Sequence, residues 1–450
     1  MSEKVFYIKT FGCQMNERDS EIIAQSLAGK GYIEGMDLDD ADLVILNTCS
    51  IRAKAEQKVM SLLGYLRKNK RANPALKICV AGCVAQQEGD RIIDRMSHVD
   101  LVIGTQNIYN IAELLVKADR EGSVVATDLK DQYDIPNLLP SSDSDPDQNN
   151  TLFRKFVTIM QGCNNYCTYC VVPYTRGREV SRKHNDITDE VKALVNEGVK
   201  EITLLGQNVN SYGKTNEVHP ANNKYSFSDL LHDVAEIQGL KRLRFTTSNP
   251  KDLTEELMVC FRDIDILCPQ FHLPVQAGSD SVLKRMNRKY SVADYLDKVD
   301  KLREFCPDIA LTTDIIVGFP GETEDDFAGT MQLLETVRYH GSFSFKYSDR
   351  PGTRASTFDK KLQIEESVKS RRLSRFQARQ DEISLERNRE YIGKIKNVMI
   401  EECSEKGVRG RTDTNHIVHL PCPTKLPVPG SFIDVKIVHA GNHSLRGEIV

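Results

Sequence analysis

Six short apolar runs recur between residues 153 and 380, and the stretches between them have helical spacing. This alternation constrains the fold more than any other feature, because strands that alternate with helices build parallel sheets. Six units fall short of a closed eight-stranded barrel, so we expect a partial (β/α)6 barrel with its reactive groups at the C-terminal ends of the strands. The strand-like runs are 156–160, 201–206, 242–247, 270–275, 311–318 and 342–348.

Residues 1–125 show the same alternation on a smaller scale, which predicts an open α/β domain with a parallel sheet. The helix between the first two strands is expected to begin at Asp19 or Ser20 and to end near Gly29 and Gly31. The strand-like runs of this region are 5–10, 42–47, 77–82 and 100–105.

Two other regions differ from these in composition and sequence pattern. Residues 126–152 are polar and acidic and contain proline, which predicts a linker. Residues 384–450 contain short strand-like runs broken by glycine and proline, as in a small β-barrel that binds oligonucleotides. The core is expected to span 153–380, and its final segment, 369–379, holds five basic residues and no acidic one. That segment is either a solvated helix face or an RNA-binding stripe.

Composition limits the classes of function. The net charge of −4 predicts no general attraction to polyanions, so any nucleic-acid surface must be local. The first residues lack a small-residue cleavage site and no run reaches the ~18 apolar residues of a membrane span, so we expect a cytoplasmic protein with no membrane contact. In that compartment the 12 cysteines are expected as metal ligands, catalytic groups or core thiols rather than disulfides.

Three cysteines follow the first strand of the expected barrel, namely Cys163, Cys167 and Cys170, with the spacing C-x3-C-x2-C. A structural zinc site usually has four ligands, and no fourth cysteine or histidine lies close by. A [4Fe–4S] cluster also takes four thiolates, so three would leave one iron open to a small molecule. This spacing therefore favours an iron–sulfur site, with a zinc or redox site as the alternative.

A second set of three cysteines is dispersed. Cys13, Cys49 and Cys83 each follow a predicted strand of the N-terminal domain by a residue or two. Because the carboxyl ends of parallel strands share one edge of a sheet, these thiols are expected to converge. The alternative is that all three are ordinary buried thiols, which is how we interpret Cys79, inside its strand.

The C-x3-C-x2-C run after the first strand of a partial barrel resembles the signature of the radical S-adenosylmethionine superfamily. With the dispersed cysteines and the C-terminal β-barrel, nearly the whole chain resembles the methylthiotransferase family, whose C-terminal module is the TRAM domain. FGCQMN (11–16), NTCSIRAKAEQKV (47–59) and LPVQAGSDSVLKRMNRKY (273–290) look most like the bacterial branch that modifies isopentenyl (dimethylallyl) adenosine-37 of tRNA. The insert 213–225 matches nothing in that pattern.

The resemblance implies two [4Fe–4S] clusters, one on each cysteine set, with the dispersed set holding an auxiliary cluster that carries sulfur. It implies two S-adenosylmethionine molecules, one as methyl donor and one as the source of a 5′-deoxyadenosyl radical that removes hydrogen from adenine C2. The partners would be the anticodon loop of tRNA, a reductant such as flavodoxin or ferredoxin, and a sulfur or iron–sulfur donor. One chain would hold every part, so we expect a monomer.

Polar side chains at the strand ends are candidates for the S-adenosylmethionine site, although each could instead hold a loop. They are Tyr169, Gln207, Asn208, Ser248, Asn249, Gln276, Ser279 and Asp314. Basic side chains after the cluster loop and in the basic segment are candidates for RNA contacts, although each could instead form an ion pair. They are Arg176, Arg178, Arg182, Arg371, Arg372 and Arg375.

Three interpretations stay open from the sequence. The first is the tRNA methylthiotransferase described above, acting on isopentenyl adenosine or on threonylcarbamoyl adenosine. The second is the branch of the family that modifies an aspartate of a ribosomal protein. The third is an iron–sulfur electron carrier or RNA-binding module without catalysis, and two incomplete cysteine sets argue against it, because full cysteine ligation suits electron transfer better than an open iron.

Overall fold

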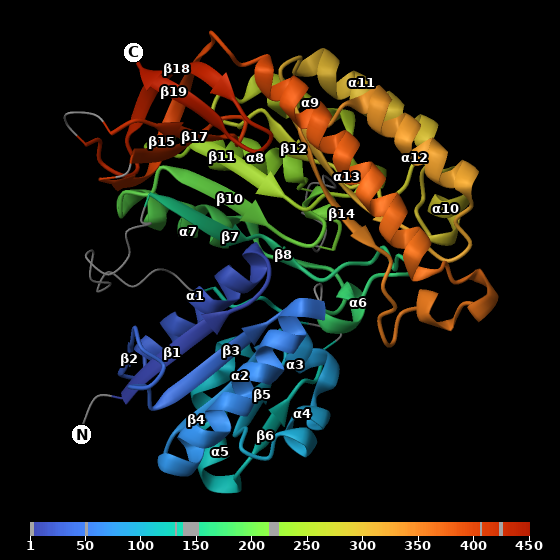
Figure 1. The fold of residues 1–450 in the computed structure, drawn as a ribbon. Coiled ribbons are helices and arrows are strands. Elements are labelled where there is room, and N and C mark those ends of the chain that lie inside the picture. Colours follow the sequence, from blue (N-terminus) through green and yellow to red (C-terminus); the bar gives the residue numbers. More distant parts are fainter. Residues whose placement is uncertain are drawn as a thin grey trace. The chain divides into compact units, whose positions relative to one another are not determined.

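The computed structural model describes residues 4–49, 53–130, 133–137, 153–215, 225–405, 407–422 and 426–450. The chain divides into two compact units (Figure 1). The first comprises residues 1–142, 160–164 and 171–182, and the second comprises residues 143–159, 165–170 and 183–450. Most of the predicted linker and most of the insert lie outside the described residues.

The first unit contains a parallel sheet with helices on both faces, as predicted, but the sheet has six strands. Its order is β2 (Tyr32–Glu34), β1 (Lys4–Thr10), β3 (Leu43–Thr48), β4 (Lys77–Gly82), β5 (Leu101–Ile103) and β6 (Val124–Ala126). The two strands at its edges, β2 and β6, were not predicted. The helices are α1 (Gln14–Ala28), α2 (Ala53–Ala72), α3 (Cys83–Glu88), α4 (Asp90–Arg95), α5 (Ile111–Glu121) and α6 (Val172–Thr175). A short hairpin pairs β8 (Met160–Gln161) with β9 (Val180–Ser181).

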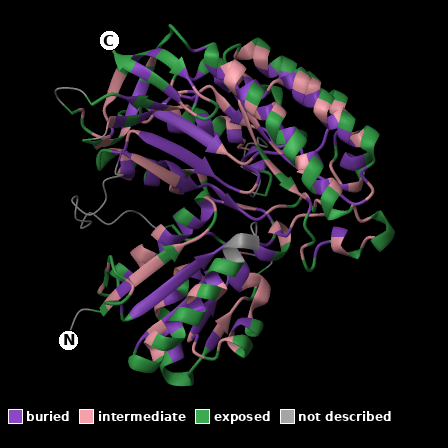
Figure 2. Ribbon diagram, in the orientation of Figure 1, coloured by how far each residue is buried: buried purple, intermediate pink, exposed green. Residues whose placement is uncertain are grey.

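Successive side chains of the central strands point to opposite faces of this sheet, so β3 is buried along its whole length. Ile45 packs with α1 and α5 through residues such as Ile23, whereas Val44 packs with α2 through Leu63. Figure 2 shows the central strands as buried and the outer helix faces as exposed. One boundary differs from the sequence prediction, because α1 begins at Gln14 rather than at Asp19 or Ser20. The helix therefore starts directly after Cys13.

The second unit contains six parallel strands in two three-stranded sheets. The first sheet has β7 (Arg154–Thr158), β10 (Glu201–Leu205) and β11 (Arg242–Thr246), and the second has β12 (Gln270–His272), β13 (Ala310–Val317) and β14 (Gly341–Lys346). A parallel bridge between Leu243 and Leu267 links the two sheets. The predicted six βα units are therefore present.

Helices follow the strands of the second unit in turn, and α8, α11 and α12 each begin with a capping box that satisfies free backbone N–H groups. The helices are α7 (His184–Asn196), α8 (Phe227–Ala235), α9 (Glu255–Asp263), α10 (Asp280–Arg285), α11 (Val292–Phe305), α12 (Glu324–Val337) and α13 (Glu366–Arg389). Among the residues that the structure describes, no helix is both long and apolar enough to cross a membrane.

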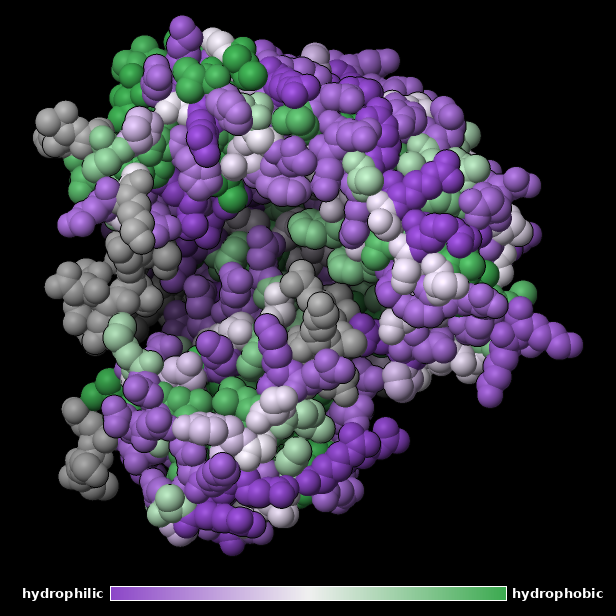
Figure 3. Space-filling model, in the orientation of Figure 1, coloured by the Kyte–Doolittle hydropathy of each residue, from purple (hydrophilic) through white to green (hydrophobic). Residues whose placement is uncertain are grey.

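The second unit ends in a closed five-stranded barrel with the order β15-β16-β17-β19-β18. Its strands are β15 (Ile395–Ser404), β16 (Gly407–Thr412), β17 (Ile417–Leu420), β18 (Phe432–Ala440) and β19 (Leu445–Ile449). Exposed apolar side chains on it include Ile395, Val438 and Ile449, and Figure 3 shows apolar residues gathered at this end of the molecule.

Two arginines fasten this barrel to the start of β11. Arg242 donates to the carbonyls of Arg411 and Asn397 at 2.8 and 2.7 Å. Arg244 donates to the carbonyls of Asp413 and Thr412 at 2.7 and 2.8 Å. Its Nε also donates to Glu201 Oε2 at 3.1 Å. Both arginines are buried, so these contacts are shielded from water.

Candidate functional site

Three neighbouring strands of the first unit deliver Cys13, Cys49 and Cys83 to one edge of the sheet. Strands β1, β3 and β4 are adjacent; Cys13 lies just beyond β1, Cys49 follows β3 directly, and Cys83 opens α3 directly after β4. The chains approach closely here: a Cβ on Gly12 would lie 2.3 Å from Cys49 Cβ. The edge is the carboxyl end of the strands, where ligands bind in open α/β sheets.

Buried amides fix this edge. Asn16 Nδ2 donates to Asn47 Oδ1 at 3.0 Å and to the carbonyl of Thr48 at 2.9 Å, while Asn47 Nδ2 donates to the carbonyl of Asn16 at 2.8 Å. These bonds tie the first turn of α1 to the end of β3 and so set Cys13 against Cys49. Sequence reasoning missed both asparagines, although each lies within two or three residues of one of the cysteines.

A buried ion pair accompanies these thiols. Arg176 Nη2 lies 2.6 Å from Asp19 Oδ2, and both side chains are 4% exposed. Burial lowers the pKa of Arg176, but the Asp19 carboxylate outweighs it and holds the guanidinium charged. A hydrogen bond with Cys49 lowers the pKa of Cys13 to about 6, and the Arg176 charge acts in the same direction. Burial raises the pKa of Cys83, and Arg176 opposes that rise.

The other three cysteines lie on the segment between β8 and α6. Gly162 turns the chain at φ +82°, and a Cβ there would lie 2.0 Å from the carbonyl oxygen of Arg178, so only glycine fits. Cys163 belongs to the first unit, and its amide donates to the carbonyl of Gly177 at 3.3 Å. Cys167 and Cys170 belong to the second unit, where the amide of Cys170 donates to the carbonyl of Cys167 at 3.0 Å.

The turn that follows α10 holds the part of this segment that belongs to the second unit. The amide of Thr168 donates to the carbonyl of Met286 at 3.0 Å, and its hydroxyl donates to the carbonyl of Arg285 at 2.9 Å. Asn287 donates to the carbonyl of Tyr166 at 3.0 Å, and Arg288 Nη1 lies 3.4 Å from Cys167 Sγ. Sequence reasoning missed this turn.

Several predicted cofactor contacts instead hold loops. Asn208 Nδ2 donates to Asp252 at 2.8 Å, Asn249 caps a short turn through the amide of Lys251, and Ser248 donates to the carbonyl of His272. Ser279 donates to Asp326. Among the described residues, Asn208 Oδ1 nevertheless has no hydrogen-bond partner, so the role of these four residues in binding S-adenosylmethionine stays a prediction.

Four further residues lie near the strand ends or in the cysteine segment. Gln276 has φ +78°, and its main chain pairs with β13, which places it at the strand ends. Tyr169 is half-buried beside Phe319, with ring centroids 6.5 Å apart. Gln207 follows β10. Asn210, which sequence reasoning missed, is 7% exposed, and neither end of its amide has a hydrogen-bond partner among the described residues.

The inner face of the second sheet carries exposed aromatic rings. Ser344 and Lys346 of β14 bond α13, so Phe343 and Phe345, which alternate with them, face the opposite side. These rings are 56% and 40% exposed. Phe343 is the register partner of Asp314, which lies 3.5 Å from His272 Nε2. The His272 ring meets Phe343 edge-on at 5.9 Å.

The predicted RNA-contacting arginines separate into two groups. Arg176, Arg182 and Arg372 are at most 5% exposed. Arg372 Nη1 lies 2.6 Å from Glu322, as Arg176 pairs with Asp19, so neither of these charges faces a phosphate. Arg178, Arg371 and Arg375 are exposed. The structure therefore supports the second group alone as surface contacts.

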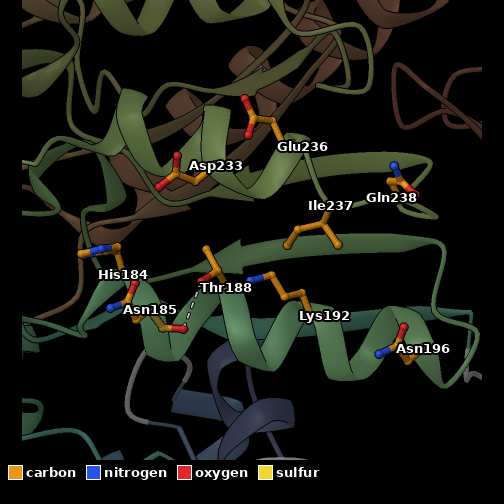
Figure 4. A pocket seen from close by; sticks show the side chains of 9 residues that line it. All are labelled: His184, Asn185, Thr188, Lys192, Asn196, Asp233, Glu236, Ile237 and Gln238. Carbon is orange, nitrogen blue, oxygen red and sulfur yellow. Dashed lines mark hydrogen bonds between the residues drawn. The ribbon is translucent and has the colours of Figure 1, made fainter.

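A cavity of about 660 Å³ lies elsewhere, between α7 and α8 (Figure 4). Thr188 and Lys192 of α7 face Asp233 of α8 and Glu236, just after that helix, across it. Its lining comes from α7, α8 and the turn after α8, and contains none of the cysteines or strand-end residues. Among the described residues, no three histidine, cysteine or carboxylate side chains are grouped as a metal site.

Comparison with known proteins agrees with this architecture. Residues 5–104 match the model of Uncharacterized protein family UPF0004, and residues 157–334 match that of the Radical SAM superfamily. A tRNA-2-methylthio-N(6)-dimethylallyladenosine synthase from Desulfotalea psychrophila is 64% identical over 450 residues, which is 100% of both chains. One from Geobacter metallireducens is 46% identical and covers 99% of this chain and 98% of its own.

A solved structure shares the fold at much lower identity. The radical S-adenosylmethionine methyltransferase TsrM from Kitasatospora setae, with cobalamin and a [4Fe–4S] cluster bound, superposes with a TM-score of 0.58 and 14% identity. The match covers 79% of this chain and 77% of that one. At this identity the likeness concerns the fold alone.

Proposed function

The chain belongs to the family of tRNA-2-methylthio-N(6)-dimethylallyladenosine synthases, and from this premise we propose that it attaches a methylthio group to C2 of N6-dimethylallyl adenosine-37 in tRNA. The observation that carries the proposal is the 64% identity, which extends over the whole chain. The reaction is a radical sulfur-group transfer that uses S-adenosylmethionine.

Each cysteine set would supply three thiolates to a [4Fe–4S] cluster and leave one iron open. Strands β1, β3 and β4 bring Cys13, Cys49 and Cys83 to one edge of the first sheet, where Cys13 favours the thiolate that a metal requires. Cys163, Cys167 and Cys170 would hold the second cluster. When bound, the clusters and S-adenosylmethionine supply the sulfur and the radical that removes hydrogen from C2.

The protein's own residues bind and orient the base. Adenine C2 is inaccessible in a stacked helix, so the nucleotide must be turned out, which a loop position permits at low cost. Phe343 and Phe345 offer aromatic surface for the base and its apolar dimethylallyl branch, with Ile316 beside Phe345 in register. Asp314 and His272 would supply polar contacts at the same face.

The exposed Arg178, Arg371 and Arg375 are candidates to hold the RNA backbone, together with the C-terminal barrel. Gln207, Gln276 and Tyr169 are candidates for S-adenosylmethionine. We further propose a cytoplasmic monomer that receives electrons from a flavodoxin or ferredoxin and sulfur from a sulfur or iron–sulfur donor.

Nucleoside analysis by mass spectrometry tests the proposal. In cells that lack the chain, we expect 2-methylthio-dimethylallyl adenosine to disappear from digested tRNA and dimethylallyl adenosine to accumulate. Restoring the chain should restore the product, and restoring a Cys170→Ala variant should not. Loss of a threonylcarbamoyl product instead, or of a modified ribosomal aspartate, would contradict the substrate assignment and favour another branch.

A further inference from the structure

Arg288 occupies a central position beside Cys167. Its Nη1 lies 3.4 Å from Cys167 Sγ, its Nη2 donates to the carbonyl of Pro274 at 2.8 Å, and its Nε donates to the hydroxyl of Tyr290 at 2.7 Å. The guanidinium also lies over the Tyr290 ring, 5.0 Å from its centroid. Because all three nitrogens of the guanidinium have a partner, the group has little freedom, and the fold holds it against Cys167 Sγ.

The two cysteine sets differ in how their neighbouring arginine is balanced. Arg176, beside Cys13 and Cys83, forms a close ion pair with Asp19. Arg288 has no carboxylate among its partners in the described part of the chain; they are a carbonyl, a phenol and the thiol. The first set therefore has a neutral pair as its neighbour, and the second has an uncompensated positive charge.

We propose that Arg288 is a positioning residue that raises the reduction potential of the cluster held by Cys167, so that this cluster accepts an electron more readily. Reduction adds one electron and one negative charge to the cluster, with no bond formed or broken and no proton moved. An N–H donor on the sulfur and a nearby cation both stabilise the more negative state. The electron comes from the low-potential reductant of the proposed function, on which this inference rests.

A redox titration of the reconstituted full-length protein, followed by electron paramagnetic resonance, tests this role. The signal that changes on adding S-adenosylmethionine is assigned to the cluster held by Cys163, Cys167 and Cys170. In Arg288→Met we expect the midpoint potential of this cluster to become more negative by at least about 59 mV. For a one-electron couple, this shift lowers the ratio of reduced to oxidised cluster at one fixed potential at least about tenfold. Arg288→Lys keeps the positive charge but lacks the branched guanidinium. Its midpoint potential should therefore lie between those of Arg288→Met and the parent chain.

Arg285→Met is the matched control. Arg285 lies three residues earlier, and its Nη2 bonds the carbonyl of Gly321 at 2.9 Å and approaches Asp326 at 3.4 Å. Removing this charge should leave the midpoint unchanged. An equal shift in both variants would show that net charge alone acts and would overturn the role of Arg288.

Iron content separates a redox role from a merely structural one. If Arg288→Met loses iron while the remaining signal titrates like that of the parent chain, Arg288 only holds the loop and the proposal is wrong. An unchanged midpoint at full iron content overturns it as well. Neither result touches the tRNA product, which is measured independently. A parent chain with no signal that responds to S-adenosylmethionine would overturn the premise of the open-iron cluster itself.

Discussion

Asp19 illustrates how much depends on single side chains at the edge of the first sheet. It lies in the first turns of α1, almost fully buried, and its carboxylate is the direct partner of Arg176. Sequence reasoning placed Asp19 at the start of a helix and Arg176 on an RNA-binding surface. A charge pattern cannot reveal a buried partner 157 residues away, so these two assignments were beyond its reach.

Asp19→Asn should lower the stability of the first unit by about 3–5 kcal/mol, because it leaves Arg176 charged, buried and unpaired. Asp19→Asn combined with Arg176→Met should recover most of that loss, since both charges are then absent. Hydrogen exchange of the β3 and β4 amides in the metal-free chain measures the effect. Asp189→Asn is the control, because its pair with Lys192 is 60% exposed on both sides and should contribute under about 1 kcal/mol. A double variant as unstable as the single one would contradict the ion-pair explanation.

At the scale of elements, the alternation of strands and helices follows from the sequence, and the contacts between them do not. Apolar runs predicted the parallel arrangement of both α/β regions, because period and length are local properties, but they did not predict β2, β6 or the division of the second region into two sheets. The start of α1 was predicted late because Gln14–Arg18 is polar, although Asn16 and Arg18 are buried. Arg288 was missed because its partners Cys167, Pro274 and Tyr290 meet through folding alone. Strand β19 carries a weak pattern and was not predicted.

The exposed rings of β14 lead to a prediction about the substrate. Phe343→Ser and Phe345→Ser should each reduce kcat/KM for tRNA about 10- to 100-fold, because stacking on an aromatic ring contributes about 1–3 kcal/mol per base. The melting temperature should change little, since both rings are already exposed. Ser344→Ala, on the opposite face of the same strand, is the matched control and should keep its activity. A large loss of stability without substrate would show that the rings instead pack against another part of the chain.

At the scale of the molecule, the junction between the C-terminal barrel and the core contains two histidines. His340 precedes β14 and His416 lies in the turn before β17, with ring centroids 5.7 Å apart. Burial lowers the pKa of His416 to about 4, and burial also lowers that of His340, helped by the charge of Arg387. Tyr391 covers His416 at 4.7 Å.

Acid should therefore weaken this junction. A folded-state pKa below the unfolded value of about 6.5 means that the unfolded chain binds more protons between pH 6.5 and 4. Stability should fall as pH decreases through that window, by about 2–3 kcal/mol for His416. Urea unfolding of the metal-free chain at several pH values measures the slope, and His416→Gln should reduce it. An identical slope in parent and variant would assign the pH effect to other groups.

The bonds from Arg242 and Arg244 to the C-terminal barrel have a consequence for how a substrate is chosen. They hold the barrel against β11, and we expect this attachment to keep the distance from the barrel to the Phe343 and Phe345 face of β14 nearly constant. If the barrel binds RNA, this distance determines which nucleotide along the RNA backbone reaches the Phe343 and Phe345 face of β14. Inserting one nucleotide between the gripped stem and the modified base should then abolish modification or move it to the neighbouring residue. An anticodon loop modified normally after insertion would show that the base itself is what the protein reads.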